Sequence, residues 1–118
     1  MPNGLSGTFT VSAAVGTTTR ITGSPLPVNG TVTLDFTSAS FSGTGVTLYK
    51  RALLPASGSG TPTWKQCAYR TAAAPGTYAT TALNADAQVY VDLDGEELGY
   101  QAGYTSGSLT CEWRWSAG

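Results

Sequence analysis

Apolar and polar residues alternate along much of this chain, which is the pattern of β-strands that bury one face. The segment GTFTVSAAV, residues 7 to 15, places apolar side chains on one face and threonine and serine on the other. The segment GTVTLDFTS, residues 30 to 38, does the same with Val32, Leu34 and Phe36. Because no segment sustains the 3.6-residue period of a helix, the pattern predicts an all-β fold.

The same alternation predicts further short strands separated by turns. We expect clear strands at residues 45–53, 63–70, 87–93, 98–104 and 108–115, and weaker ones near 18–22 and 77–81. The turn signals between them are Asn29-Gly30, Ser42-Gly43, Pro75-Gly76, Asp94-Gly95 and Ser106-Gly107. About seven to nine short strands at this spacing predict an antiparallel β-sandwich or a jelly roll, which share the same local pattern.

The length of 118 residues predicts a single domain that spans residues 1–118. Residues 1–6 read as a flexible arm before the first strand. The stretch ALLPASGSGTP, residues 52–62, reads as one long loop. No linker divides the chain, so we expect one β-sandwich with these two appendages.

Charged residues make up 11% of the chain and the net charge is −1. The six lysines and arginines are spread along the sequence, so no basic run favours nucleic acid as a partner. No apolar run approaches the ~18 residues needed to cross a bilayer, and the N-terminus lacks the regions of a secretory signal. We therefore expect a soluble chain, cytoplasmic or already processed, that contacts neither nucleic acid nor membrane.

The segment VDLDGEEL, residues 91 to 98, contains four of the seven acidic residues: Asp92, Asp94, Glu96 and Glu97. A calcium loop needs oxygen ligands at alternate positions and a glutamate several residues after the glycine. Here Glu96 and Glu97 follow Gly95 at once, so the register of a calcium loop fails. Asp94-Gly95 is a dipeptide that supplies positive φ to a tight hairpin, and we interpret the cluster as a soluble hairpin tip.

The chain contains no histidine, which removes the commonest general base and most zinc or iron sites. Carboxylates at a solvated turn lack the contrasting environments that acid–base catalysis needs. The glycine-rich stretches at 43–45 and 57–60 do not open a helix, so they do not form a phosphate cradle. We expect a protein that is not an enzyme and uses no cofactor or metal.

The last predicted strand contains CEWRW, in which Trp113 and Trp115 lie on one face about 7 Å apart. Exposed indoles at this spacing could stack on successive sugar rings. Leu109 and Cys111 continue the same face, however, which favours the core. Cys67 and Cys111 are interpreted as two small buried hydrophobes, with a disulfide as the alternative.

Three segments of the chain resemble the small β-sandwich virion proteins of tailed bacteriophages: VTLYKR at 46–51, TWKQCAY at 63–69, and VYVDLDGEELGYQAGYTSGSLTCEW at 89–113. Those proteins commonly show a Val-Thr-Leu strand that ends in a basic residue, a Thr-Trp strand start, and a late Tyr-Thr-Ser-Gly turn. The matching positions here are Val46, Thr47, Leu48 and Arg51, then Thr63 and Trp64, then Tyr104, Thr105, Ser106 and Gly107.

The resemblance implies a structural virion protein made in the bacterial host cytoplasm, which decorates or cements the capsid surface. Its partners would be the major capsid protein and further copies of itself, with a trimer favoured. We expect contacts from segments whose apolar residues lack strand alternation to hide them: Pro2, Asn3 and Leu5 in the arm, and Leu53, Leu54 and Pro55 in the loop. The alternative is a carbohydrate-binding or host-adhesion module of a phage tail or fibre, with Trp115 as its sugar platform.

Overall fold

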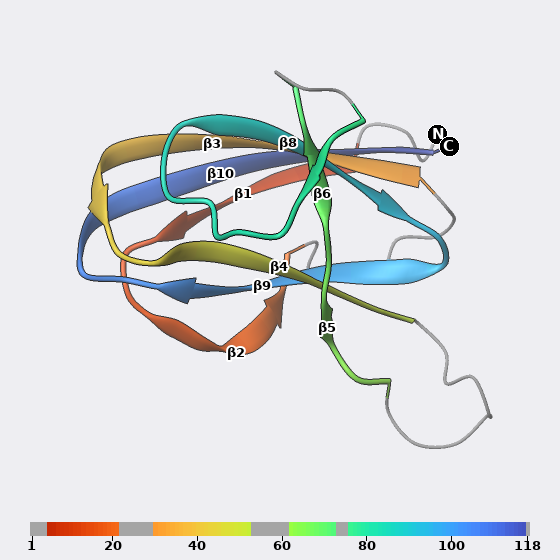
Figure 1. Cartoon of the computed structure of the whole chain (residues 1–118), viewed down its shortest axis with the longest axis horizontal. Helices are drawn as coiled ribbons and strands as arrows, with labels where there is room; N and C mark the ends of the chain where they lie inside the picture. Colours follow the sequence, from red (N-terminus) through yellow and green to blue (C-terminus); the bar gives the residue numbers. More distant parts are fainter. Residues whose placement is uncertain (1–4, 22–29, 53–61, 73–75, 118) are drawn as a thin grey trace.

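The protein is an antiparallel β-sandwich, as the alternation predicted (Figure 1). The computed structural model describes residues 5–21, 30–52, 62–72 and 76–117. Within these ranges ten strands form a six-stranded sheet and a four-stranded sheet, and no helix is long and apolar enough to cross a membrane. The strands are β1 (Leu5–Val11), β2 (Val15–Arg20), β3 (Gly30–Ser42), β4 (Gly45–Ala52), β5 (Lys65–Gln66), β6 (Tyr69–Thr71), β7 (Tyr78–Ala79), β8 (Ala87–Leu93), β9 (Glu96–Gly103) and β10 (Ser106–Ala117).

The six-stranded sheet has the order β1-β10-β3-β8-β6-β7, and the four-stranded sheet has the order β2-β9-β4-β5. The first and last strands of the chain are neighbours, because β1 pairs with β10 from Leu5↔Trp115 to Val11↔Leu109. On its other side β10 pairs with β3, where one bulge sets Ala39 and Ser40 opposite Ser108. The last strand therefore lies between two strands from the first third of the chain.

Several tight turns within the described residues connect the two sheets and do not form hairpins. Gly95 has the positive φ that the sequence predicted, 68°, yet β8 belongs to the six-stranded sheet and β9 to the four-stranded sheet. The same holds for the β3–β4 and β9–β10 connections. We call such a connection an arch. The prediction of a hairpin at Asp94-Gly95 was wrong, because positive φ reverses the chain without deciding which strand becomes its neighbour.

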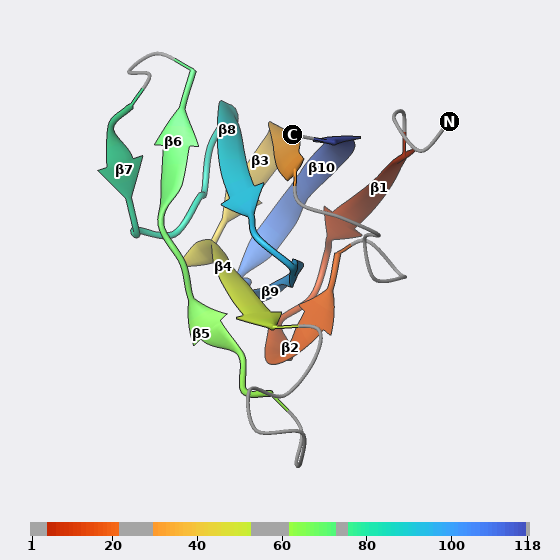
Figure 2. The same cartoon turned by 90° about the vertical axis from the view of Figure 1, so that its right-hand side faces the viewer.

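Two predicted strands are each divided between the sheets. Residues 7–15 form the end of β1 and the start of β2, with Ser12 to Ala14 as the crossing. Residues 63–70 include β5 in one sheet and the start of β6 in the other, and Figures 1 and 2 show this segment running across the side of the sandwich. Alternation continues through the first crossing and so could not reveal it, whereas the consecutive polar residues Lys65 and Gln66 interrupt it just before the second.

Gly30 is a strand residue and not part of a turn. It opens β3, is buried, and pairs with both Leu93 and Ala117. A Cβ atom at Gly30 would lie 2.7 Å from Trp115 Nε1, so only glycine leaves room for the indole. Asn29, the other half of the predicted turn, lies outside the described residues.

The core lies between the sheets and includes many of the residues that alternation assigned to the inner faces. On β3, Val32, Leu34 and Phe36 are 0–3% exposed. The inner face of β10 contributes Leu109, Cys111, Trp113 and Trp115, all buried. This confirms that the CEWRW segment contributes its tryptophans to the core.

Cys67 and Cys111 are free and buried, in agreement with their interpretation as small hydrophobes. Burial raises the pKa of the Cys67 thiol to about 11, and it raises the pKa of the Cys111 thiol further. Both thiols therefore stay protonated and poorly nucleophilic near neutral pH.

Candidate functional site: the charged end of the sandwich

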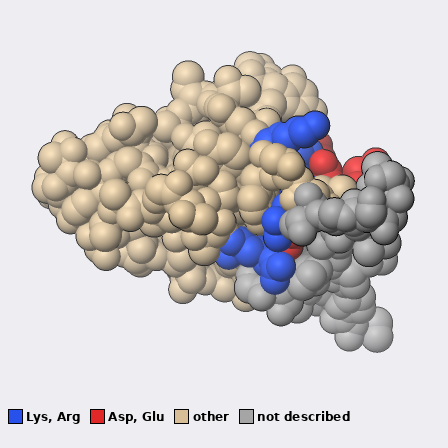
Figure 3. All heavy atoms as spheres, turned by 90° about the horizontal axis from the view of Figure 1, so that it is seen from below, with Lys and Arg blue, Asp and Glu red and all other residues tan. Residues whose placement is uncertain are grey.

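Charged side chains gather at one end of the sandwich, next to the β8–β9 arch, and leave the opposite end of the visible face without charge (Figure 3). The ends of β2, β4 and β8 and the start of β9 meet there. We call this region the charged end, and it comprises Arg20, Lys50, Arg51, Arg70, Asp92, Asp94, Glu96 and Glu97. The opposite end, here called the uncharged end, is built by the connections at 12–14, 43–44 and 104–105.

Glu97 is a buried carboxylate held between two arginines. It is 3% exposed, although it projects from the outer face of the four-stranded sheet, on the side of β9 opposite to the buried Leu98. Arg20 Nε from β2 and Arg51 Nε from β4 each lie 2.5 Å from one of its two carboxylate oxygens. Each carboxylate oxygen thus has its own cation, which offsets much of the cost of burying the charge.

Trp64 covers the same outer face beside this cluster. The guanidinium carbon of Arg51 lies 4.3 Å from the centroid of the indole, a cation–π contact. A Cβ atom at Gly99 would lie 2.9 Å from Trp64 Cη2, so the ring rests directly on the backbone of β9. Trp64 is half-buried, and it leaves part of an aromatic ring at the surface next to two arginines.

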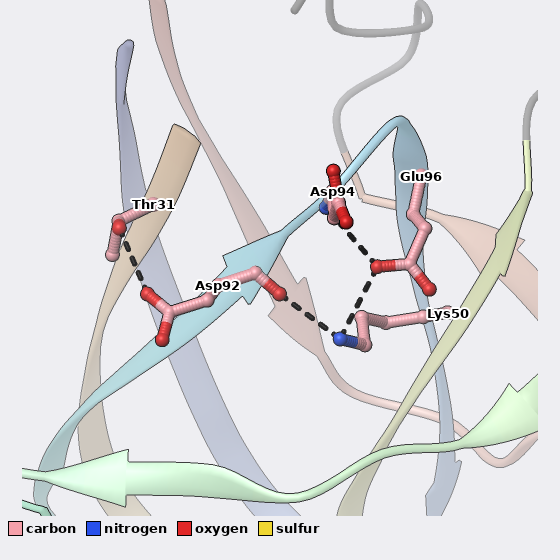
Figure 4. Close-up of polar contacts among 5 residues, drawn as sticks. All are labelled: Thr31, Lys50, Asp92, Asp94 and Glu96. Atoms are coloured by element: carbon pink, nitrogen blue, oxygen red, sulfur yellow. Dashed lines mark hydrogen bonds and ion pairs between the residues drawn. The ribbon is translucent and has the colours of Figure 1, made fainter. Parts of the chain in front are cut away.

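Lys50 links the two sheets at this end, and the remaining acids of the β8–β9 arch form contacts within their own sheet or within the arch (Figure 4). Lys50 Nζ, from the four-stranded sheet, donates a 3.0 Å hydrogen bond to the backbone carbonyl of Asp92 and lies 3.3 Å from Glu96 Oε1. Glu96 Oε1 also accepts a 3.1 Å hydrogen bond from the backbone N–H of Asp94. The Asp92 carboxylate accepts bonds from Thr31 Oγ1 at 2.9 Å and from Arg70 at 2.7 Å.

The acidic cluster is therefore a structural network, and its interpretation as a solvated hairpin tip needs correction. Asp92 and Asp94 are exposed, whereas Glu96 is half-buried and Glu97 is buried. Among the described residues no three acidic, cysteine or histidine side chains are arranged to hold a metal ion. Nothing in the sequence pattern indicated the Arg20–Glu97–Arg51 cluster, since its members come from three strands that are far apart along the chain.

The predicted contact residues lie mostly outside the part of the chain that the structure describes. Pro2, Asn3, Leu53, Leu54 and Pro55 all fall there. Leu5 is the first residue of β1 and pairs with Trp115, so the predicted arm of residues 1–6 ends in a sheet.

The described residues next to both predicted contact segments lie at the charged end. Ala52, the last residue before the predicted loop, pairs with Glu96 beside the β8–β9 arch. Leu5 lies at the same end, because its partner Trp115 pairs on the other side with Val32, close to the start of β3.

Trp115 is 1% exposed and packs against Gly30. An indole buried to this extent presents no face to a sugar ring, so its position does not support the alternative of a sugar platform at Trp115. Three surface hollows lie beside described strands. One lies beside Arg70 and Tyr90, one beside Gly16 and Gln101, and one beside Thr8 and Arg114.

The described residues form an antiparallel β-sandwich with a network of ion pairs at one end. No protein-family model matches the chain, and no curated protein matches it at a significant level. Among solved structures, the SPBc2 prophage-derived protein YomS is similar, with a TM-score of 0.55 and 14% sequence identity. The match covers 94% of this chain and 93% of YomS, and at this identity it concerns the fold.

Proposed function

We propose that this chain is a non-enzymatic structural protein of a tailed-bacteriophage particle, which binds and stabilises the capsid as a decoration or cement protein. The observation that carries the proposal is the fold shared with a prophage-derived protein over nearly the full length of both chains. The resemblance of the VTLYKR, TWKQCAY and GYTSGS segments to small virion proteins points in the same direction.

The chemistry of the described side chains supports a binding role. Glu97 is held by Arg20 and Arg51, and Asp35 lies 3.2 Å from Arg114 Nη1. Carboxylates committed to such pairs do not provide the free acid and base that hydrolysis requires. The buried thiols have raised pKa values, so they are poor nucleophiles as well.

The charged end is the surface that we assign to the capsid. Trp64, Tyr49, Arg51 and Arg20 lie on the same face there, and tryptophan, tyrosine and arginine are the residues that most often anchor protein interfaces. The segments with Leu5 and with Leu53, Leu54 and Pro55 join the described fold at this end. Many copies on a symmetric lattice would convert modest single contacts into a stable shell.

The test is binding of the purified protein to expanded capsids that lack it, measured by co-sedimentation and by the temperature at which the capsids lose their contents. We expect binding and a raised temperature, and we expect Leu53→Glu together with Leu54→Glu to abolish both. The matched control is Thr44→Glu at the uncharged end, which should bind like the unchanged protein. Mass spectrometry of heads and tails separated from the particles gives the second readout. Presence in tails alone would contradict the capsid role and favour adhesion.

A further inference from the structure

The outer edge of β1 is the longest regular sheet edge in the described part of the chain. β1 ends the six-stranded sheet and has β10 as its one neighbouring strand there (Figure 2). Its seven residues, LSGTFTV, pair with β10 in unbroken register. The strand contains no charged residue, proline or bulge. Its outer row of backbone N–H and C=O groups is therefore a template for another strand.

The other three sheet edges carry the features with which proteins block such pairing. β5 and β7 have two residues each, and β5 contains Lys65. β2 is longer, but its register with β9 shifts between Val15 and Thr19, and it ends in Arg20. Among the described sheet edges, the β1 edge is therefore the one most open to a partner strand.

The sequence of β1 is complementary to itself. In an antiparallel pair related by a two-fold axis at Thr8, all seven residues overlap, with Leu5 opposite Val11 and Ser6 opposite Thr10 of the second copy. Thr8 faces its own counterpart on the outer face, where threonine pairs are favourable. No like charges meet anywhere along this register, because β1 is uncharged.

The inner face of β1 also fits this pairing. A Cβ atom at Gly7 would lie 2.8 Å from Trp113 Nε1, so the Trp113 indole occupies the space above Gly7. Phe9 is half-buried and stacks on Tyr100 with ring centroids 4.3 Å apart. In the two-fold register Phe9 of the second copy lies opposite Gly7, and an aromatic residue across from a glycine is a stabilising combination in sheets. Each Phe9 would then come next to the Trp113 of the other copy.

We propose that two copies of this chain pair through their β1 strands, antiparallel and about a two-fold axis at Thr8, which joins the two six-stranded sheets into one continuous sheet. The contact is between copies, so it holds whether or not the protein decorates a capsid. A single pair of strands buries less surface than a standard interface of ~1,600 Å², and the dimer therefore dissociates readily on dilution.

The first test is disulfide trapping of a Thr8→Cys variant under mild oxidation. The two introduced thiols would face each other across the axis, whereas the native Cys67 and Cys111 are buried with raised pKa values and provide little background. Thr37→Cys, at an exposed site on β3 of the same sheet, is the matched control. We expect a covalent dimer from Thr8→Cys and none from Thr37→Cys. Equal trapping of the two variants would overturn the proposal.

The second test measures the dimer itself by sedimentation equilibrium across a range of concentrations. Because like charges opposite each other destabilise a strand pair, Thr8→Lys and Thr8→Glu should each raise the dissociation constant about fivefold. A mixture of the two variants should restore the original affinity, which separates loss of pairing from loss of folding. A chain that remains monomeric at the highest soluble concentration, or a trimer unaffected by Thr8→Lys, would contradict the proposed pairing.

Discussion

At the charged end, ion pairs beside the arch connect β2 and β4 to β9, and another connects β6 to β8. At the uncharged end, three connections turn the chain between the same two sheets with serine, alanine, glycine, threonine and tyrosine. There the chain is held by backbone contacts, such as the 2.8 Å hydrogen bond from Thr105 N–H to the carbonyl of Ser42. Gly45 has a φ of 106°, which side-chain-bearing residues rarely adopt.

Changes of sheet at the two ends are thus accompanied by different contacts, side-chain ion pairs at the charged end and backbone contacts at the uncharged end. The ion pairs and the backbone contacts are weakened by different changes. Ion pairs respond to salt and to loss of one partner, whereas a glycine in a crowded backbone responds to any added atom. Substitutions at the two ends should therefore separate in both size and salt dependence.

The largest effect is expected from Gly45→Ala at the uncharged end. The new methyl group would lie 2.5 Å from the Leu83 carbonyl oxygen, which accepts the hydrogen bond from Val46 N–H, and alanine would also be strained at this φ. We expect a loss of about 4 kcal/mol in the free energy of unfolding, measured by urea denaturation. Gly16→Ala is the control, since a methyl group there meets no atom within 4 Å. Similar losses from the two variants would refute the role given to backbone crowding.

Glu97→Gln tests the charged end and should lower the free energy of unfolding somewhat less than Gly45→Ala does. It leaves Arg20 and Arg51 side by side without the carboxylate, and both arginines are partly exposed, at 33% and 21%. We expect a loss of about 2–3 kcal/mol that shrinks in about 1 M salt, whereas the cost of Gly45→Ala should not change with salt. Glu96→Gln, which removes one half-exposed contact to Lys50, is the control and should cost less than about 1 kcal/mol. An equal loss of unfolding free energy from Glu97→Gln and Glu96→Gln would show that burial of Glu97 contributes nothing to this loss.

The smallest change in the free energy of unfolding is expected at alkaline pH, which tests the buried Cys67 near the charged end. Because burial raises the pKa of Cys67 from 9.0 to about 11, the folded state keeps the thiol proton that the unfolded state loses. The contribution of Cys67 to stability is therefore complete below pH 9 and is lost as the pH rises toward 11, by about 1–2 kcal/mol. Urea denaturation at pH 8 and pH ~10.5 measures this slope. The Cys67→Ala variant should show a shallower slope than the unchanged protein, and parallel slopes would exclude the thiol as the cause.

Alternation predicted the fold class and the buried faces because those depend on each strand alone. Val32, Leu34 and Phe36 on β3 and the tryptophans of β10 are in the core, as their spacing indicated. The partner of each strand is a property of the whole chain. For that reason Asp94-Gly95 revealed a turn but not an arch, and residues 63–70 were predicted as one strand although the chain changes sheet at Cys67–Ala68.

The candidate site was predicted less well than the fold. The four acids of VDLDGEEL were interpreted as a hairpin tip in solvent, whereas Glu97 is buried. Its burial depends on Arg20, which lies 77 positions earlier along the chain (97 − 20), and on Arg51. Local sequence carries no signal that these three residues will be in contact in the folded protein. Trp64, by contrast, matched a position of the pattern of small virion proteins.

The placement of β10 between β1 and β3 has a consequence for biosynthesis. Of the ten described strands β10 is translated last, so β1 and β3 leave the ribosome before the neighbour that they share. Folding is then a late event with contacts that span most of the chain, and such topologies fold slowly. During that interval chaperones, and not the native sheet, would have to shield these two strands.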